Sequence, residues 1–370
     1  MKKLCCAAIA ADIPIDVICG ILSYLPVKSV LRFKCVSKSW YSLISDSHFK
    51  KLHRFQSQKA TYDQVFVLQN LDNNYSFCET SFFDDIISGN CTQMELPFRH
   101  NLLLSNATIL SSCDGLLLVR NSDGQLTLMN PSTKESRKLP EGVVYGSKRP
   151  CYDLGYDSST NDYKVLLRQS VHIPEIDAFR IETTILSLKT NCWRKVKNVT
   201  RQDRNGVNFN ESLNWVHAKS WLANEIKIVS FSLASETTTE IEHPADCDTG
   251  THADLGVLQG CLCLTATSIF TCSVNIWLMK EFGVPNSWTK LISTPKLPRN
   301  YVSRTIPLPL NYTNKTVFLI DKYNGDLLIL NDLEAEQHYR FVNIANFRTY
   351  KLLTEFAFSR SLVSPNSVFF

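Results

Sequence analysis

The side chains that could do chemistry gather in one polar stretch of the second half of the chain. The stretch combines imidazole and carboxylate groups, at His243, Asp246, Asp248, His252 and Asp254. Such groups are metal ligands, and Asp248-Thr249-Gly250 is also the tripeptide of the aspartic proteases. However, that tripeptide has no second copy and no apolar strand before it, and the ligand-type residues have no fixed spacing. We therefore expect a solvated loop here, with no metal and no cofactor.

Other catalytic motifs are absent from the sequence. It contains no G-x-G-x-x-G, no P-loop, no G-x-S-x-G and no His-Glu-x-x-His. A triad assembled from distant residues leaves no motif, so an enzyme stays among the alternatives. The 13 cysteines include no C-x-x-C pair, which indicates reduced thiols rather than a disulfide framework or a zinc site.

Residues 13–52, near the start of the chain, carry apolar residues at helical spacing. Pro14 can occupy a first helical turn, and Pro26 ends the helix. The wide apolar face of this first helix is formed by Val17, Ile18, Ile21, Leu22 and Leu25. Two further helices are predicted, one with Val27, Val30, Leu31 and Phe33 turned inward and one carrying Trp40, Leu43 and Ile44.

Three short helices hold more apolar surface than they can hide from water, and an excess of this kind indicates a docking face. Residues 1–60 hold ten Lys and Arg against three Asp, a net charge of +7, while the whole chain carries +4. An acidic protein or a nucleic acid would suit this charge. Because the basic residues are interleaved with the apolar ones, we favour a protein partner and expect no nucleic acid.

This helical stretch resembles the F-box. The resemblance rests on Ile13-Pro14-x-Asp16-Val17, on the stretch from Ile21 to Ser29, and on Leu31 to Trp40, with Ile13 in place of the usual Leu. It implies docking on the Skp-family adaptor of an SCF (Skp, cullin, F-box) ubiquitin ligase. The contacts it implies are Ile13, Pro14, Ile18, Ile21, Leu22, Leu25, Pro26, Val27, Leu31, Val36 and Trp40. The alternative is an ordinary helical cap packed on the domain that follows.

The first eleven residues imitate a secretory signal, because Met1-Lys2-Lys3 precedes an apolar run. That run is near the lower length limit for such a signal. We therefore expect a flexible N-terminus, no membrane association and a cytoplasmic or nuclear protein.

From residue 111 onward, short apolar strands alternate with polar turns. A longer period overlies this rhythm, since strands that end in a polar turn begin near Ile185, Val229, Asn275 and Leu327. Repeats of forty to fifty residues with several strands each are typical of propeller blades. Most Trp residues fall at strand positions, where an aromatic side chain usually fills the core.

Four motifs of this region look like the F-box-associated domain of a large plant family. They are Cys113-Asp-Gly-Leu-Leu, Asn130-Pro-Ser-Thr with Arg137-Lys-Leu-Pro, Gly155-Tyr-Asp with Asp162-Tyr-Lys-Val, and Ile276-Trp277 with Ser287-Trp288. The double glycine of kelch repeats is missing. The expected fold is α+β and multidomain: a flexible 1–12, a small three-helix F-box at 13–53, a connecting segment with first strands at 54–109, an antiparallel all-β propeller-like domain at 110–350, and a C-terminal segment at 351–370.

By this resemblance the chain is expected to be the non-catalytic substrate-recognition subunit of an SCF ligase. The β domain would capture a protein target that the sequence does not identify. One alternative is an F-box scaffold or sequestering protein without ligase function. Narrower still is the S-locus group, whose pollen members would recognise stylar ribonucleases. The last alternative is an enzyme or sugar-binding propeller with a helical cap.

Overall fold

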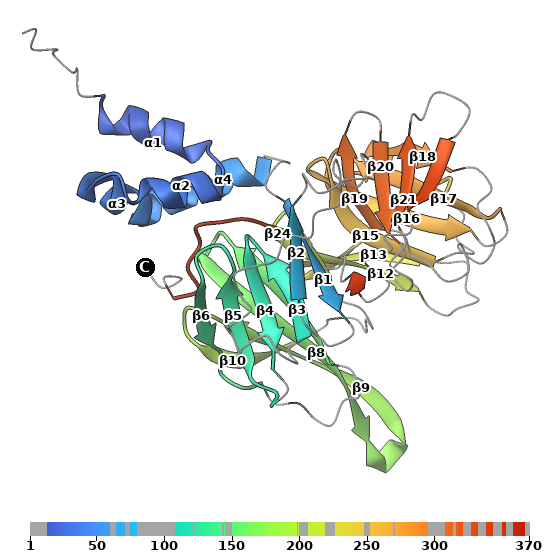
Figure 1. Ribbon diagram of the computed structural model, residues 1–370. Coiled ribbons are helices and arrows are strands. Elements are labelled where there is room, and N and C mark those ends of the chain that lie inside the picture. Colours follow the sequence, from blue (N-terminus) through green and yellow to red (C-terminus); the bar gives the residue numbers. More distant parts are fainter. Residues whose placement is uncertain are drawn as a thin grey trace, which may run out of the picture.

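The computed structural model shows four helices at the N-terminus and a series of small antiparallel sheets behind them (Figure 1). It describes residues 13–59, 64–70, 75–79, 108–121, 123–142, 144, 150–197, 199, 206–218, 226–247, 252–268, 271–294, 308–313, 316–320, 327–331, 338–342, 350–352 and 358–366.

The helical module comprises α1 (Ile15–Ser23), α2 (Val27–Phe33), α3 (Lys38–Ser45) and α4 (Ser47–Lys59). Pro14 and Pro26 stand directly before α1 and α2, and the hydroxyl of Ser37 accepts the backbone N–H of Trp40 at the start of α3. These are helix boundaries that the residue types favour.

The three predicted helices are present, but the module has a fourth, which the sequence analysis missed. The α4 helix is polar and follows α3 after a single residue, Asp46. The Asp46 carboxylate accepts the backbone N–H groups of His48 and Phe49, and these hydrogen bonds lower its pKa. The Asp46-Ser47 pair was the available capping signal.

Five four-stranded sheets follow one another in chain order, each with its strands joined as an antiparallel meander. Sheet 1 holds β3 (Thr108–Cys113), β4 (Leu116–Arg120), β5 (Leu126–Asn130) and β6 (Glu135–Lys138). Sheet 2 holds β7 (Cys151–Asp157), β8 (Asp162–Ile173), β9 (Ala178–Ser187) and β10 (Cys192–Val196). Sheet 3 holds β11 (Val207–Phe209), β12 (Ser212–Ala218), β13 (Ile226–Ser232) and β14 (Thr238–Ile241).

Sheet 4 holds β15 (His252–Leu258), β16 (Cys261–Ser268), β17 (Ser273–Met279) and β18 (Trp288–Ser293), with a short 3₁₀ turn at Pro285–Ser287. Sheet 5 holds β19 (Leu308–Thr313), β20 (Thr316–Ile320), β21 (Leu327–Asn331) and β22 (His338–Val342). The predicted long period is confirmed, because the strands expected near residues 185, 229, 275 and 327 are the third strands of sheets 2 to 5.

A sixth sheet joins the two ends of the β region. It pairs β1 (Gln64–Asn70) with β2 (Tyr75–Glu79) on one side and with β23 (Tyr350–Leu352) and β24 (Phe358–Ser359) on the other. Strands from 280 residues apart in the sequence thus share one sheet, an arrangement that ties the array together as in a propeller-like fold.

Apolar layers fill the spaces between neighbouring sheets. One buried cluster combines Leu116, Leu118 and Leu128 of sheet 1 with Leu154 and Val165 of sheet 2. Further clusters link sheet 2 to sheet 3 and sheet 3 to sheet 4. Trp215 and Trp277 are buried and Trp193 and Trp288 are partly buried, as expected of strand residues.

The β8–β9 hairpin projects beyond its sheet on the side away from the helices (Figure 1). Its outer rungs, from Gln169 with Glu182 to Ile173 with Ala178, pair with each other past the last partners of β7 and β10. A 3₁₀ turn at Pro174–Ile176 closes the tip.

Candidate docking surface

The helical module has a small apolar core of its own. Leu22 of α1, Val27 and Val30 of α2, Ile44 of α3 and Phe49 of α4 are buried together. Phe33 and Trp40 meet edge to face at its rim, with ring centroids 5.4 Å apart. His53 of α4 lies beneath α1, with its Nε2 2.9 Å from the carbonyl oxygen of Leu25. These contacts fix the four helices relative to one another.

The outer side of this module carries large apolar side chains in water. Val17, Ile21 and Tyr24 are exposed and follow one another along α1 at offsets of four and three, which places them on one stripe. Beside it, Ile18, Leu22 and Leu25 form a second stripe that packs against the core. Among the described residues, one stripe thus packs against the core of the module, whereas Val17 and Ile21 of the other stripe are exposed.

Further apolar side chains of the helical module are exposed outside the α1 stripe. They are Ile13, Ile15, Val36, Tyr41 and Phe55. With the α1 stripe, they make up most of the large apolar side chains that are exposed among the described residues of the whole chain. Surface patches of this kind mark sites of protein–protein contact.

The eleven side chains predicted to bind a partner fall into three groups. Those in water are Ile13, Pro14, Ile21, Pro26 and Val36, with Ile21 57% and Val36 59% exposed. Those partly buried are Ile18, Leu25, Leu31 and Trp40. Leu22 and Val27 are 2% and 0% exposed and lie in the core of the module. The predicted contacts did not include the exposed Ile15, Val17, Tyr24, Tyr41 and Phe55, although the three–four spacing of Val17, Ile21 and Tyr24 was readable.

Basic side chains are also exposed on the helical module. Lys28, Arg32 and Lys38 are exposed on α2 and at the start of α3. The described part of the module thus keeps the mixture of apolar and basic residues that the sequence indicated, and it suits an acidic protein surface.

The opposite side of the module is anchored to sheets 1 and 2 by Arg54 of α4. The Arg54 guanidinium lies 3.8 Å from the centre of the Tyr156 ring, and its Nη1 is 3.3 Å from an oxygen of Asp114. Nη1 also donates to the Tyr163 hydroxyl, which in turn donates to Asp114 over 3.0 Å. One basic side chain thereby contacts both sheets.

A tight turn places Asp114 for this contact. Asp114 and Gly115 both have positive φ, 48° and 78°, which is the type I′ hairpin geometry that Asp-Gly favours between β3 and β4. Burial alone would lower the pKa of Arg54, but Asp114 and the two tyrosines outweigh it and raise the pKa. Burial, with the nearby Asp114 charge, also raises the pKa of Tyr163. The guanidinium stays charged and the phenol stays neutral.

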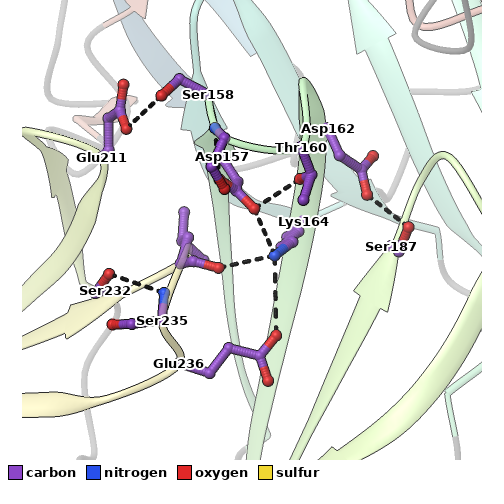
Figure 2. A network of polar contacts seen from close by, with 12 residues as sticks. Asp157, Ser158, Thr160, Asp162, Lys164, Ser187, Glu211, Ser232, Ser235 and Glu236 are labelled. Carbon is purple, nitrogen blue, oxygen red and sulfur yellow. Dashed lines mark hydrogen bonds and ion pairs between the residues drawn. The ribbon is translucent and has the colours of Figure 1, made fainter.

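A second cluster of titratable and hydroxyl groups lies between sheets 2 and 3 (Figure 2). Lys164 Nζ is 2.7 Å from Asp157 Oδ2 and donates to the carbonyl oxygen of Leu233 over 2.8 Å. Glu236 lies 3.8 Å from the same ammonium and pairs with Arg194. Ser, Lys and Asp are the residue types of hydrolytic sites, so their geometry matters.

Hydrogen bonds in this cluster both close the β7–β8 turn and join it to sheet 3. Asp157 accepts hydrogen bonds from Ser159 and Thr160 in its own turn, while Ser158 donates to Glu211 of sheet 3 over 2.7 Å (Figure 2). Burial opposes the charge of Asp157, but the bonds from Lys164, Ser159 and Thr160 prevail and hold its pKa below 3.8. The Lys164 ammonium contacts both Asp157 of sheet 2 and the Leu233 carbonyl oxygen beside sheet 3, so this cluster functions as a clamp between the two sheets.

In the polar stretch with metal-ligand residue types, Asp246 and His243 contact other groups of the protein. Asp246 accepts a hydrogen bond from the indole N–H of Trp277 over 3.0 Å and pairs with Lys290 at 2.5 Å. His243 Nδ1 lies 2.9 Å from the carbonyl oxygen of Pro244. Asp248, Thr249 and Gly250 lie outside the described residues. Within the described ranges, no three His, Cys, Asp or Glu side chains come together as a metal site.

Of the helices that the structure describes, none combines the length and apolar character needed to cross a membrane.

Comparison with known proteins gives two family matches. Residues 11–52 match the F-box domain, and residues 64–366 match the F-box associated beta propeller domain. An F-box/kelch-repeat protein of Arabidopsis thaliana is 29% identical over 373 residues, which cover 96% of this chain and 97% of the relative. The F-box protein CPR1 of the same plant is 29% identical over 355 residues, covering 88% of this chain and 83% of the relative.

Proposed function

Because the chain belongs to the F-box proteins that carry an F-box-associated propeller domain, we propose that it is the substrate-recognition subunit of an SCF-type ubiquitin ligase. The F-box docks on a Skp-family adaptor and, through it, on a cullin. The propeller domain holds a protein target. The chain itself makes and breaks no bonds; its contribution to ubiquitin transfer is proximity.

The observation that carries this proposal is the exposed apolar pair of Val17 and Ile21 on α1. The same helix buries its neighbouring stripe, so this pair is not needed for the fold of the module. Burying one such side chain in a partner contributes about 1.5–3 kcal/mol. Several together suffice for a stable complex, and the exposed Lys and Arg beside them suit an acidic adaptor.

A place in the cytoplasm or the nucleus belongs to this proposal, because the 13 cysteines show no disulfide or zinc spacing. The cysteines whose side chains the structure describes form no disulfide with one another. Burial raises the pKa of Cys263 to about 12, so this thiol stays protonated.

The proposal is tested by mixing the purified chain with a purified plant Skp adaptor and analysing the mixture by size-exclusion chromatography with light scattering. We expect a one-to-one complex that also recruits a cullin. A folded, monomeric chain that elutes apart from every adaptor tried would contradict the proposal. Target levels that stay constant in cells lacking the chain, despite adaptor binding, would favour the scaffold alternative over the ligase subunit.

A further inference from the structure

The last described residues of the chain return to the first helices. After β24, the segment 360–366 runs between the helical module and sheet 1 (Figure 1). Its Leu362 is 2% exposed and belongs to the buried cluster of Leu22, Val27, Ile44 and Phe49. The core of the F-box therefore contains one side chain from the opposite end of the sequence.

Sheet 1 holds this segment through one buried amide, Asn130. The Asn130 Nδ2 donates to the carbonyl oxygens of Ser361, over 3.0 Å, and Val363, over 2.6 Å. Its Oδ1 accepts the backbone N–H of Ser132 over 2.8 Å and so fixes the β5–β6 turn. Both ends of the amide are used, and Asn130 is fully buried.

Neighbouring side chains of the segment face opposite partners. Leu362 lies in the helical core, whereas Val363 packs against the apolar cluster between sheets 1 and 2. The hydroxyl of Ser361 accepts the backbone N–H of Val363, and Ser361 and Ser364 are buried. The segment is an ordered layer between the two parts of the molecule.

The contact of Leu362 with the helical core lies on the same helix, α1, as the candidate docking surface. Leu22 shares the core with Leu362, and Ile21, the next residue along α1, is exposed on the outer stripe. A helical module of this size is marginally stable alone. Removing a buried Leu from it leaves a cavity and lowers its stability.

We propose that the segment 360–366 stabilises the adaptor-docking module. Leu362 is the positioning residue that holds α1 and α2 in the arrangement that binds the adaptor. This inference rests on the proposed function. A chain that lacks the segment samples the competent arrangement less often, and its apparent affinity for the adaptor falls in the same proportion.

The test compares Leu362→Ala with Leu278→Ala, a matched truncation of a leucine buried in sheet 4. Hydrogen exchange of the full-length chain measures the helices and the sheets separately. We expect Leu362→Ala to speed amide exchange in α1 and α2 about tenfold or more and to weaken binding of a purified plant Skp adaptor by a similar factor. The Leu278→Ala variant should leave both values near wild type, and Leu362→Met should restore most of the protection.

Asn130→Ala removes the amide that holds the segment, so it should act in the same direction as Leu362→Ala on exchange in the helices. If Leu362→Ala unfolds the whole chain, Leu362→Val carries the same comparison with a smaller expected change, about threefold. Wild-type exchange and adaptor affinity in the Leu362 variants would overturn the inference and leave the ligase proposal standing. A wild-type chain that binds no adaptor would defeat the proposed function, while the exchange measurement would still report whether the segment supports the helices.

Discussion

The F-box exposes apolar side chains to water, whereas the first propeller sheets bury charged side chains. On the F-box, Val17 and Ile21 of α1 are exposed although the adjacent stripe of the helix is buried. Between sheets 2 and 3, Asp157 and Lys164 are buried and pair with each other. The exposure of Val17 and Ile21 suits a partner from outside the chain. The buried charges already have theirs, so they serve the fold.

The strongest test of this contrast is Lys164→Met, which removes the ammonium that faces a fully buried carboxylate. Breaking a buried pair by removing one member costs about 3–5 kcal/mol. We expect this loss in the free energy of unfolding, measured by urea denaturation at pH 7, and no change in adaptor affinity while the chain stays folded. The double variant Lys164→Met with Asp157→Leu should recover part of the loss. If Lys164→Met alone lowers the unfolding free energy by less than about 1 kcal/mol, the Asp157–Lys164 pair does not stabilise the fold.

Acid titration gives a milder probe of the same pair. The folded-state pKa of Asp157 lies below its ordinary 3.8. Its contribution is therefore fully present above the unfolded pKa and is lost as the pH falls from about 4 toward the lower folded-state pKa. We expect the unfolding free energy of wild type to fall more steeply below pH 4 than that of Asp157→Asn. Stability is measured by circular dichroism melts at each pH. The same pH dependence for wild type and Asp157→Asn would contradict the lowered pKa of Asp157.

Arg54→Met tests how the two regions are joined. The substitution keeps much of the apolar stem but removes the cation over Tyr156 and the partner of Asp114. A desolvated cation–π contact contributes about 2 kcal/mol. We expect faster cleavage of the chain near α4 in limited proteolysis, with little change in the unfolding of the sheets. Lys51→Met, at an exposed position of the same helix, is the control. Equal cleavage of the two variants would assign the anchoring to other contacts.

The sequence predicted most of the local structure, because helix periodicity, proline positions and the strand–turn rhythm are local signals. It could not separate Leu22 and Val27, which lie in the core, from Ile21 and Val36, which lie in water. A helix with two adjacent apolar stripes presents one broad face in the sequence, and only the tertiary structure shows which half is covered. The burial of Leu362 among α1, α2, α3 and α4 had no local signal either, because it pairs opposite ends of the chain.

The central claim is that the apolar face of the F-box binds an adaptor, and titration calorimetry with two matched variants tests it most directly. Ile21→Ser and Phe179→Ser each remove one highly exposed apolar side chain, from α1 and from the β8–β9 hairpin, where Phe179 is 65% exposed. Neither should change the unfolding free energy by more than about 0.5 kcal/mol. We expect Ile21→Ser to weaken binding of a plant Skp adaptor about tenfold or more, and Phe179→Ser to bind like wild type. Equal affinities for Ile21→Ser and wild type would contradict the claim.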